Sequence, residues 1–233
     1  MKILVTTGCS YTHYRYYTWA DYLSKGYDKF FNLGMAGSSI KFSYIKVLDY
    51  IRANKDTLNN TDIFIQWTSL KRHYLINEDP PKGQIDNNAD FNEEFIKNYF
   101  DIEDKAIELY NYIEHLILLS EKYKFNIKMF YMFEPWIGDY AGEPTNTSII
   151  LHETTKKYLE SSICTTLKNL YSKEYWITPS LESFSLKNEK RGPEHRYPPE
   201  HGGGIDEHPT TEQHRMFSEH INKGRNFPKK DIL

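Results

Sequence analysis

The sequence has 233 residues, of which 39% are hydrophobic and 15% aromatic, and its formal net charge is -3. The length favours one large domain, and the apolar share suffices for a core, which excludes a chain that is disordered throughout. A charge near zero, without a long basic run, argues against a nucleic-acid partner. The two cysteines, Cys9 and Cys164, are too few for a disulfide framework or a four-thiolate zinc site.

The apolar run within residues 1–7 is too short for a secretion signal or a membrane anchor. We therefore expect a cytoplasmic protein that does not contact a membrane. The sequence gives no indication of the oligomeric state. Its 19 tyrosines have two explanations, an AT-rich coding genome or contact with a sugar or another ligand.

Strand and helix patterns alternate along the chain. Short apolar runs predict strands at residues 2–6, 62–67, 127–133 and 175–177, with a further apolar patch at 30–33. Helical spacing predicts helices at 39–53, 91–123, 150–172 and 210–223, and polar loops are expected at 77–90 and 134–147. This alternation predicts an α/β fold with a mostly parallel sheet covered on both faces. In such sheets the ligand binds beyond the carboxyl ends of the strands.

Four segments at those positions carry candidate chemistry. Ser10 follows the strand-ending Gly8, so its hydroxyl can project from a sharp turn, although a capping serine is the plainer interpretation. The glycine-punctuated loop at 32–39 can offer a backbone N–H to an oxyanion or serve as an ordinary turn before a helix. Beyond the strand at 62–67 lie Thr68, Ser69 and Arg72.

The fourth segment contains Asp206 two residues before His208. Side chains at this spacing share one side of an extended segment, so the carboxylate can orient the imidazole. Five of the nine histidines lie within residues 195–220, but none of these five forms an i, i+4 pair. We therefore expect solvated histidines and no metal or other cofactor.

In order and spacing, these segments resemble the SGNH (GDSL-type) hydrolase family. Residues 8–12 match its first block and residues 32–37 its second, residues 19–23 look like the helix between them, and Asp206 with His208-Pro209 matches the last block. The resemblance spans about residues 3–222. It implies a three-layer α/β/α, flavodoxin-like fold with a mostly parallel sheet of about five strands. It also implies a single domain over 1–233, with an elaboration around 77–123 and a Pro/Gly/His-rich segment at 187–209.

The resemblance assigns roles to particular residues. Ser10 is the expected nucleophile, His208 the base and Asp206 its orienting carboxylate. The oxyanion hole is expected from the backbone N–H groups of Ser10 and Gly37. The family's third block usually adds an Asn, which this chain lacks, so a hydroxyl of Thr68 or Ser69 would replace it.

The last block departs from the family as well. The family's Asp commonly stands three residues before the His, whereas Asp206 stands two before it. Glu207 is therefore a rival orienting group, and a Ser–His dyad is a further alternative.

Aromatic residues gather on the same loops. Tyr11, Trp67 and Trp136 are expected to contact substrate, because flat rings suit sugars, while packing under the first helix is the alternative for about half of these aromatics. Arg72 is expected to bind a substrate carboxylate or phosphate, or to be an ordinary surface residue.

The leading interpretation is a serine ester hydrolase that removes a small acyl group, such as acetyl, from a carbohydrate or a similar polar ester. One alternative is a binding or structural protein on the same fold, which would fit a phage-encoded, virion-associated protein. Another is an acyltransferase that uses the same residues.

Overall fold

Four parallel strands form the centre of the fold in the computed structural model. It describes residues 1–70, 72, 101–135, 155–171, 173–188 and 208–223. The strands are β1 (Ile3–Thr7), β2 (Lys29–Asn32), β3 (Thr61–Trp67) and β4 (Asn126–Tyr131), in the order β2-β1-β3-β4. Trp176 adds an isolated parallel bridge to Met129 of β4. The predicted parallel sheet is confirmed, with Trp176 standing where a fifth strand was expected.

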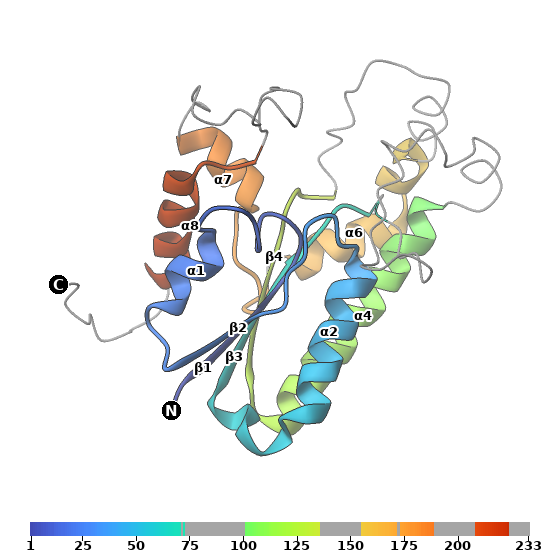
Figure 1. The fold of residues 1–233 in the computed structure, drawn as a ribbon. Helices are drawn as coiled ribbons and strands as arrows, with labels where there is room; N and C mark the ends of the chain where they lie inside the picture. The colour runs from blue at the N-terminus through green and yellow to red at the C-terminus, as the bar shows by residue number, and fades with distance from the viewer. Residues whose placement is uncertain (71, 73–100, 136–154, 172, 189–207, 224–233) are drawn as a thin grey trace.

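Helices cover both faces of this sheet (Figure 1). One face carries α2 (Ile40–Ala53), α4 (Ile102–Tyr123) and α6 (Ser162–Leu170), and the other carries α1 (Trp19–Ser24), α7 (Leu181–Asn188) and α8 (Thr211–Lys223). A 3-10 helix, η1 (Lys55–Asn60), joins α2 to β3. The three-layer α/β/α architecture predicted from the sequence is therefore present.

Side-chain alternation along the strands divides the core into two clusters. Val5, Ile63 and Ile65 pack toward α2 and α4 in a cluster rich in aliphatic side chains. Leu4 and Phe64 point to the opposite face and join a cluster that contains Trp19, Phe130 and Phe217. Successive residues of a strand point to opposite sides of a sheet, so each run fills both layers. No helix in the described part of the chain is long and apolar enough to cross a membrane.

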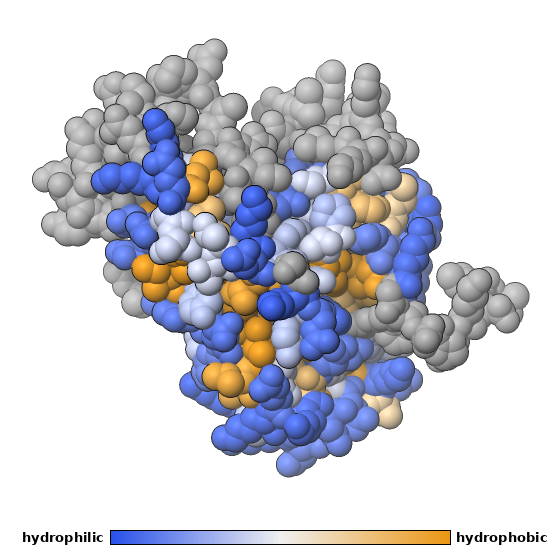
Figure 2. Space-filling model, turned by 180° about the vertical axis from the view of Figure 1, so that it is seen from behind, coloured by the Kyte–Doolittle hydropathy of each residue, from blue (hydrophilic) through white to orange (hydrophobic). Residues whose placement is uncertain are grey.

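The described residues seen from behind are mostly hydrophilic, with small hydrophobic patches between them (Figure 2). The large hydrophobic residues exposed among those described are Met1, Tyr17, Phe31, Ile107 and Leu118. They are scattered over several elements, as is normal for isolated surface side chains.

The helices begin where polar side chains satisfy their first N–H groups. Ser39 caps α2 by accepting from the backbone of Phe42, and Asp101 caps α4 by accepting from that of Glu103. The predicted helix at 150–172 is interrupted instead, because a new helix, α6, begins after Ser161. The Ser161 side chain caps it by accepting a hydrogen bond from the backbone N–H of Cys164. Of the predicted helix at 91–123, residues 102–123 are helical and 91–100 lie outside the described residues, as does the loop predicted at 77–90.

Helix α7 was not predicted. It begins after Ser180, whose hydroxyl accepts from the backbone N–H of Ser183 at 3.2 Å. A serine cap before an acidic first turn is a helix-start signal, and Ser180 followed by Glu182 fits this pattern.

The sheet order reverses between β1 and β3, because the chain adds β2 on one side of β1 and β3 on the other. Such a reversal opens a crevice at the carboxyl ends of the two strands. The segments that follow β1 and β3 therefore meet where a ligand site is expected.

Candidate active site

Ser10 lies in a tight turn directly beyond the carboxyl end of β1. The carbonyl of Cys9 accepts hydrogen bonds from the backbone N–H groups of Thr12 and His13, at 2.9 and 3.1 Å. The chain thus makes a helical turn immediately after the strand, with Ser10 near its start. Ser10 is only 6% exposed, so its hydroxyl is largely shielded from water.

The turn requires the glycine that precedes Ser10. Gly8 has a φ of +154°, and a Cβ there would lie 2.3 Å from Thr12 Oγ1 and 2.6 Å from Gln66 Oε1. That space is filled because Thr12 Oγ1 donates a 2.6 Å hydrogen bond to Oε1 of Gln66, a fully buried side chain of β3. Strand β3 therefore fixes the turn that follows β1.

The loop between β2 and α2 packs against the same turn. The carbonyl of Gly8 accepts from the backbone N–H of Met35 and from the hydroxyl of Ser38, both at 2.9 Å. Gly37 has a φ of +75°, a left-handed conformation that glycine adopts without steric cost. These bonds hold the loop that carries Gly37 against the Ser10 turn.

His208 reaches Ser10 from the far end of the chain. Its Nε2 lies 2.7 Å from Ser10 Oγ, a hydrogen-bonding distance. With the ring proton on Nδ1, Nε2 accepts the hydrogen bond from the serine hydroxyl. The structure thus brings together the two residues that the sequence named as nucleophile and base.

Aromatic rings from the Ser10 loop surround His208. The ring of Tyr14 stacks on the imidazole, with centroids 4.2 Å apart and planes inclined by 17°. Tyr11 meets the imidazole edge-on, at 5.2 Å and 61°. Tyr16 donates a 2.9 Å hydrogen bond from its hydroxyl to the carbonyl of Pro209, the next residue along the chain.

Helix α8 begins just after this segment, at a capping box. The N–H of Thr210 donates to Gln213 Oε1 at 2.7 Å, and the N–H of Gln213 donates to Thr210 Oγ1 at 3.1 Å. Gln213 Nε2 also donates to the carbonyl of Ser185 in α7, at 2.9 Å. The start of α8, and with it the position of His208, is therefore tied to α7.

Helix α7 is in turn tied to the sheet through Glu134, a residue that no motif in the sequence marks. This carboxylate follows β4 and accepts from the backbone N–H of Ser180 at 2.9 Å, from the Ser183 hydroxyl at 2.7 Å, and from the Ser180 hydroxyl. Burial acts to raise the pKa of Glu134, but the hydrogen bonds from Ser180 and Ser183 outweigh it and hold the pKa below its ordinary value. Glu134 is thus an anion at the N-terminus of α7, where it is favoured.

Thr68, Ser69 and Arg72 follow β3 at the same edge. Thr68 is 3% exposed, and within the described part of the chain its Oγ1 has no hydrogen-bond partner. Ser69 is half-buried, and its carbonyl accepts from the backbone N–H of Arg72 at 3.2 Å. Arg72 Nη1 approaches the carbonyl of Ser38 at 3.4 Å, so this side chain contacts the loop that carries Gly37.

Two residues expected to contact substrate are buried, and one of them, Tyr11, lies beside His208. Trp67 is fully buried in the core cluster under α2 and α4, so the prediction that it contacts substrate is wrong for this structure. Tyr11 is buried as well, and its hydroxyl donates to Glu182 Oε2 at 3.2 Å. Both were expected at a surface because the sequence does not separate an aromatic residue that faces the ligand from one that packs in the core. Trp136, Asp206 and Glu207 lie outside the described residues.

The described histidines of the C-terminal region take part in separate contacts. His208 meets Ser10, His214 packs against the rings of Tyr11 and Tyr16, and His220 Nε2 lies 2.7 Å from the carbonyl of Thr178. Among the residues that the structure describes, no three His, Cys, Asp or Glu side chains are grouped to hold a metal ion. His195 and His201 lie outside them.

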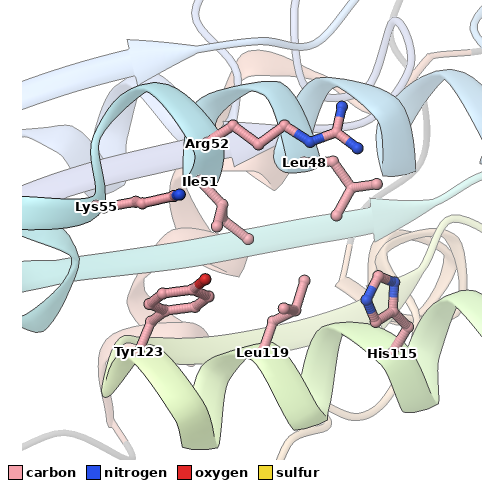
Figure 3. A pocket seen from close by; sticks show the side chains of 7 residues that line it. All are labelled: Leu48, Ile51, Arg52, Lys55, His115, Leu119 and Tyr123. Carbon is pink, nitrogen blue, oxygen red and sulfur yellow. The ribbon is translucent and has the colours of Figure 1, made fainter.

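A separate groove of about 300 Å³ lies between α2 and α4 (Figure 3). Its lining combines apolar side chains with basic ones: Leu48, Ile51, Leu119 and Tyr123 with Arg52, Lys55 and His115. The groove lies toward the C-terminal ends of both helices, whereas the N-terminus of α2 contacts the Ser10 turn through Ser38. It is therefore not part of the Ser10 site.

No family model matches the sequence, and no curated protein matches it either. Among solved structures, a similar one is the crystal structure of a member of the lipolytic protein G-D-S-L family from Veillonella parvula. The match covers 96% of this chain and 97% of that one, with 12% sequence identity and a TM-score of 0.49. The nucleophile and base proposed below therefore depend on contacts within this chain, above all that between Ser10 and His208.

Proposed function

We propose that the protein is a serine ester hydrolase with an SGNH-type mechanism. The observation that carries this proposal is the 2.7 Å distance between Ser10 Oγ and His208 Nε2. A serine hydroxyl paired with an imidazole is the arrangement that activates serine as a nucleophile. The pair lies at the carboxyl edge of the sheet where the strand order reverses, the place at which α/β folds bind ligands.

The proposed reaction proceeds through an acyl-enzyme. Ser10 Oγ forms a bond to the ester carbonyl carbon while its proton passes to His208 Nε2. The tetrahedral intermediate then breaks its bond to the alcohol oxygen, which takes the proton from His208. A water molecule then attacks the acyl carbon and gives a proton to His208 Nε2. The bond from the acyl carbon to Ser10 Oγ breaks, Oγ takes the proton back from His208, and the carboxylic acid leaves.

The developing oxyanion needs hydrogen-bond donors. We assign these to the backbone N–H groups of Ser10 and Gly37 and to the hydroxyl of Thr68. Thr68 is preferred to Ser69 because a buried hydroxyl without a partner among the described residues costs stability unless a ligand satisfies it. Asp206 or Glu207 is proposed to orient Nδ1 of His208, with a dyad as the remaining alternative.

A small acyl group, such as acetyl, suits a serine that is only 6% exposed. The proposed alcohol portion is a carbohydrate or a similar polar group. Tyr11 and Trp67 no longer support stacking on a sugar, so this part of the proposal depends on the resemblance stated above and on Trp136. Arg72 is proposed as a contact for a substrate carboxylate or phosphate.

The nucleophile is tested by turnover of a short-chain aryl acetate and by labelling with a fluorophosphonate. We expect wild type to be active and labelled, and Ser10→Ala to lose at least about 10³-fold in kcat/KM and all labelling. Ser24→Ala, in α1, is the matched control and should behave as wild type. Equal turnover by wild type and Ser10→Ala would overturn the assignment. A wild type that is neither active nor labelled would favour a non-catalytic binding protein.

The oxyanion assignment is tested at Thr68. Thr68→Val should lower kcat by about 10²–10³-fold, the usual loss for one donor. Thr68→Ser should retain most activity, and Thr68→Asn supplies the amide donor that the family usually has. If Ser69→Ala causes the loss and Thr68→Val does not, Ser69 is the donor.

A further inference from the structure

We propose that Tyr14 is a positioning residue for His208, which fixes the plane of the imidazole and stabilises its protonated form. The inference rests on the proposed function, because it concerns the imidazolium that forms when His208 takes the proton of Ser10. It adds to the reaction a residue that the serine–histidine pair itself does not require.

The geometry points to Tyr14 through contacts on two sides of the imidazole. The Tyr14 ring lies nearly parallel to the imidazole at a centroid distance of 4.2 Å, while the Tyr11 ring abuts it edge-on at 5.2 Å. Tyr11 is itself held by its hydrogen bond to Glu182. A rotation of His208 about its side-chain bonds would therefore have to displace one ring or the other.

The place of Tyr14 in the chain also supports the proposal. Tyr14 belongs to the loop that carries Ser10, and the turn at the start of that loop is fixed by the bonds to the Cys9 carbonyl. One loop thus supplies both the nucleophile and the surface on which the base rests. The Ser10 loop therefore contacts the base directly, in addition to the contacts that hold the start of α8.

The face of an aromatic ring carries negative potential and attracts a cation within about 6 Å of its centroid. A neutral imidazole gains stacking energy from such a ring, and an imidazolium gains the electrostatic attraction as well. Because His208 becomes cationic only as it accepts the serine proton, Tyr14 favours the charged state that the reaction creates.

Other groups act on the same imidazole. Arg15 places its guanidinium 5.5 Å from the centroid of the Tyr14 ring and is exposed, so it competes for that ring. Glu182 lies behind Tyr11, on α7, and its charge favours an imidazolium. Among the described residues, the other titratable groups near His208 are Tyr11, whose ring contacts the imidazole, and Tyr16 and His214, which contact the rings of Tyr14 and Tyr11.

The first test is the titration of His208, followed by NMR in the intact protein without substrate. Tyr14→Leu removes the ring at similar volume and should lower the pH at which His208 titrates by about half a unit. Tyr14→Phe should leave it nearly unchanged, and Tyr14→Trp, with the stronger ring face, should raise it. Tyr17→Leu is the matched control, because Tyr17 lies in the same loop, is 68% exposed and contacts Tyr22.

The second test is the pH profile of ester hydrolysis. Tyr14→Leu should lower kcat about tenfold with KM little changed and should shift the acidic limb of kcat/KM to lower pH, because His208 works in its neutral form. Tyr14→Phe should keep kcat and the acidic limb of kcat/KM as in wild type. If Tyr14→Leu fails to fold, the order of Trp, Tyr and Phe variants carries the same test.

The inference is overturned if His208 titrates at the same pH in wild type and Tyr14→Leu, or if Tyr14→Phe loses as much activity as Tyr14→Leu. The proposed function fails by a different result, which is a wild type without turnover or labelling. In that case the NMR titration still decides whether Tyr14 stabilises the imidazolium.

Discussion

The turn that carries Ser10 and the segment that carries His208 meet at 2.7 Å, but they are held in different ways. The Ser10 turn follows the central strand β1 directly. Its bonds go to the buried Gln66 of β3, and the Gly8 carbonyl before it accepts from Met35 and Ser38. Few residues separate this turn from the sheet, so the sheet itself determines where Ser10 lies.

His208 is attached to the sheet through a longer series of contacts. Glu134 beyond β4 holds the start of α7, α7 accepts the hydrogen bond from Gln213, and Gln213 caps α8 just after His208. Each of these contacts is a point at which the position of the His208 segment can change. Aromatic contacts from the Ser10 loop then secure the imidazole directly.

We therefore expect the nucleophile and the base to respond to different perturbations. Changes in β1, β3 or the loop after β2 should displace Ser10, and His208 with it, because Tyr14 and Tyr16 move with that loop. Changes in α7 or α8 should displace His208 alone. Amide hydrogen exchange at Thr12 and His13 reports the turn, and the NMR signals of His208 report the base.

The largest effect is expected from Gly8→Ala. The new Cβ would meet Thr12 Oγ1 and Gln66 Oε1 at 2.3 and 2.6 Å, in a conformation that alanine rarely adopts. We expect the free energy of unfolding to fall by roughly 3–5 kcal/mol and esterase activity to be lost. Denaturant unfolding and fluorophosphonate labelling measure both quantities.

Gly26→Ala is the matched control for that change. A Cβ at Gly26 would have only the carbonyl of Leu23 nearby, at 3.8 Å. We expect wild-type activity and a change in stability of less than about 1 kcal/mol. Similar losses in both variants would show that the Ser10 turn is not specially constrained.

The sequence predicts the Ser10 side of this comparison well because its signals are local. The buried run of β1, the glycine after it and the serine two residues later all lie within residues 3–10. The backbone conformation of Gly8 and the packing of Thr12 on Gln66 follow from the same short segment and one neighbouring strand.

The His208 side could not be predicted in the same way. Glu134 and Ser180 are 46 residues apart, and nothing near either residue indicates that they pair. Helix α7 has eight residues of mixed polarity, so its hydrophobic pattern is weak even though Ser180 marks its start. The stacking of Tyr14 on His208 joins opposite ends of the chain, and only the folded chain reveals it.

The next largest effect is expected from Glu134→Gln, which removes the charge at the start of α7. Charge-assisted hydrogen bonds are worth about 1.5–3 kcal/mol, and we expect a loss in this range at pH 7. Hydrogen exchange at Thr12 and His13 should stay unchanged while kcat falls, because only the contacts that hold His208 are weakened. Faster exchange at Thr12 would contradict the separation of the two sides.

The contribution of Glu134 to folding stability should depend on pH. The pKa of Glu134 is lowered in the folded state. The stability that its carboxylate contributes is therefore fully present above the ordinary pKa, and it is lost as the pH falls through the pKa of the folded protein. The difference in unfolding free energy between wild type and Glu134→Gln should therefore shrink as the pH is lowered below about 4.5. Glu160→Gln, at an exposed position, is the control and should show no such convergence.

A smaller effect is expected from Thr210→Ala, which opens the capping box of α8. Loss of an N-cap side chain costs about 1 kcal/mol, and here it also removes a bond two residues from His208. We expect Tm to fall by a few degrees and kcat to fall severalfold with KM unchanged. Thr210→Ser, which keeps the cap, should restore both, and its failure to do so would indicate a packing role for the methyl group.

The smallest effect is expected from Tyr16→Phe, which removes one hydroxyl and keeps the ring. The hydroxyl donates to the carbonyl of Pro209, and an intramolecular hydrogen bond of this kind contributes about 1 kcal/mol. Because Tyr16 links the Ser10 loop to the His208 segment, its loss should lower kcat two- to fivefold, by roughly 0.4–1 kcal/mol in activation free energy, while labelling at saturating fluorophosphonate stays complete. Tyr17→Phe, in the exposed part of the same loop, should change neither quantity. If Tyr16→Phe has no effect on kcat while Tyr14→Leu has a large one, ring contacts alone hold the base on the nucleophile loop, and the Pro209 bond serves stability.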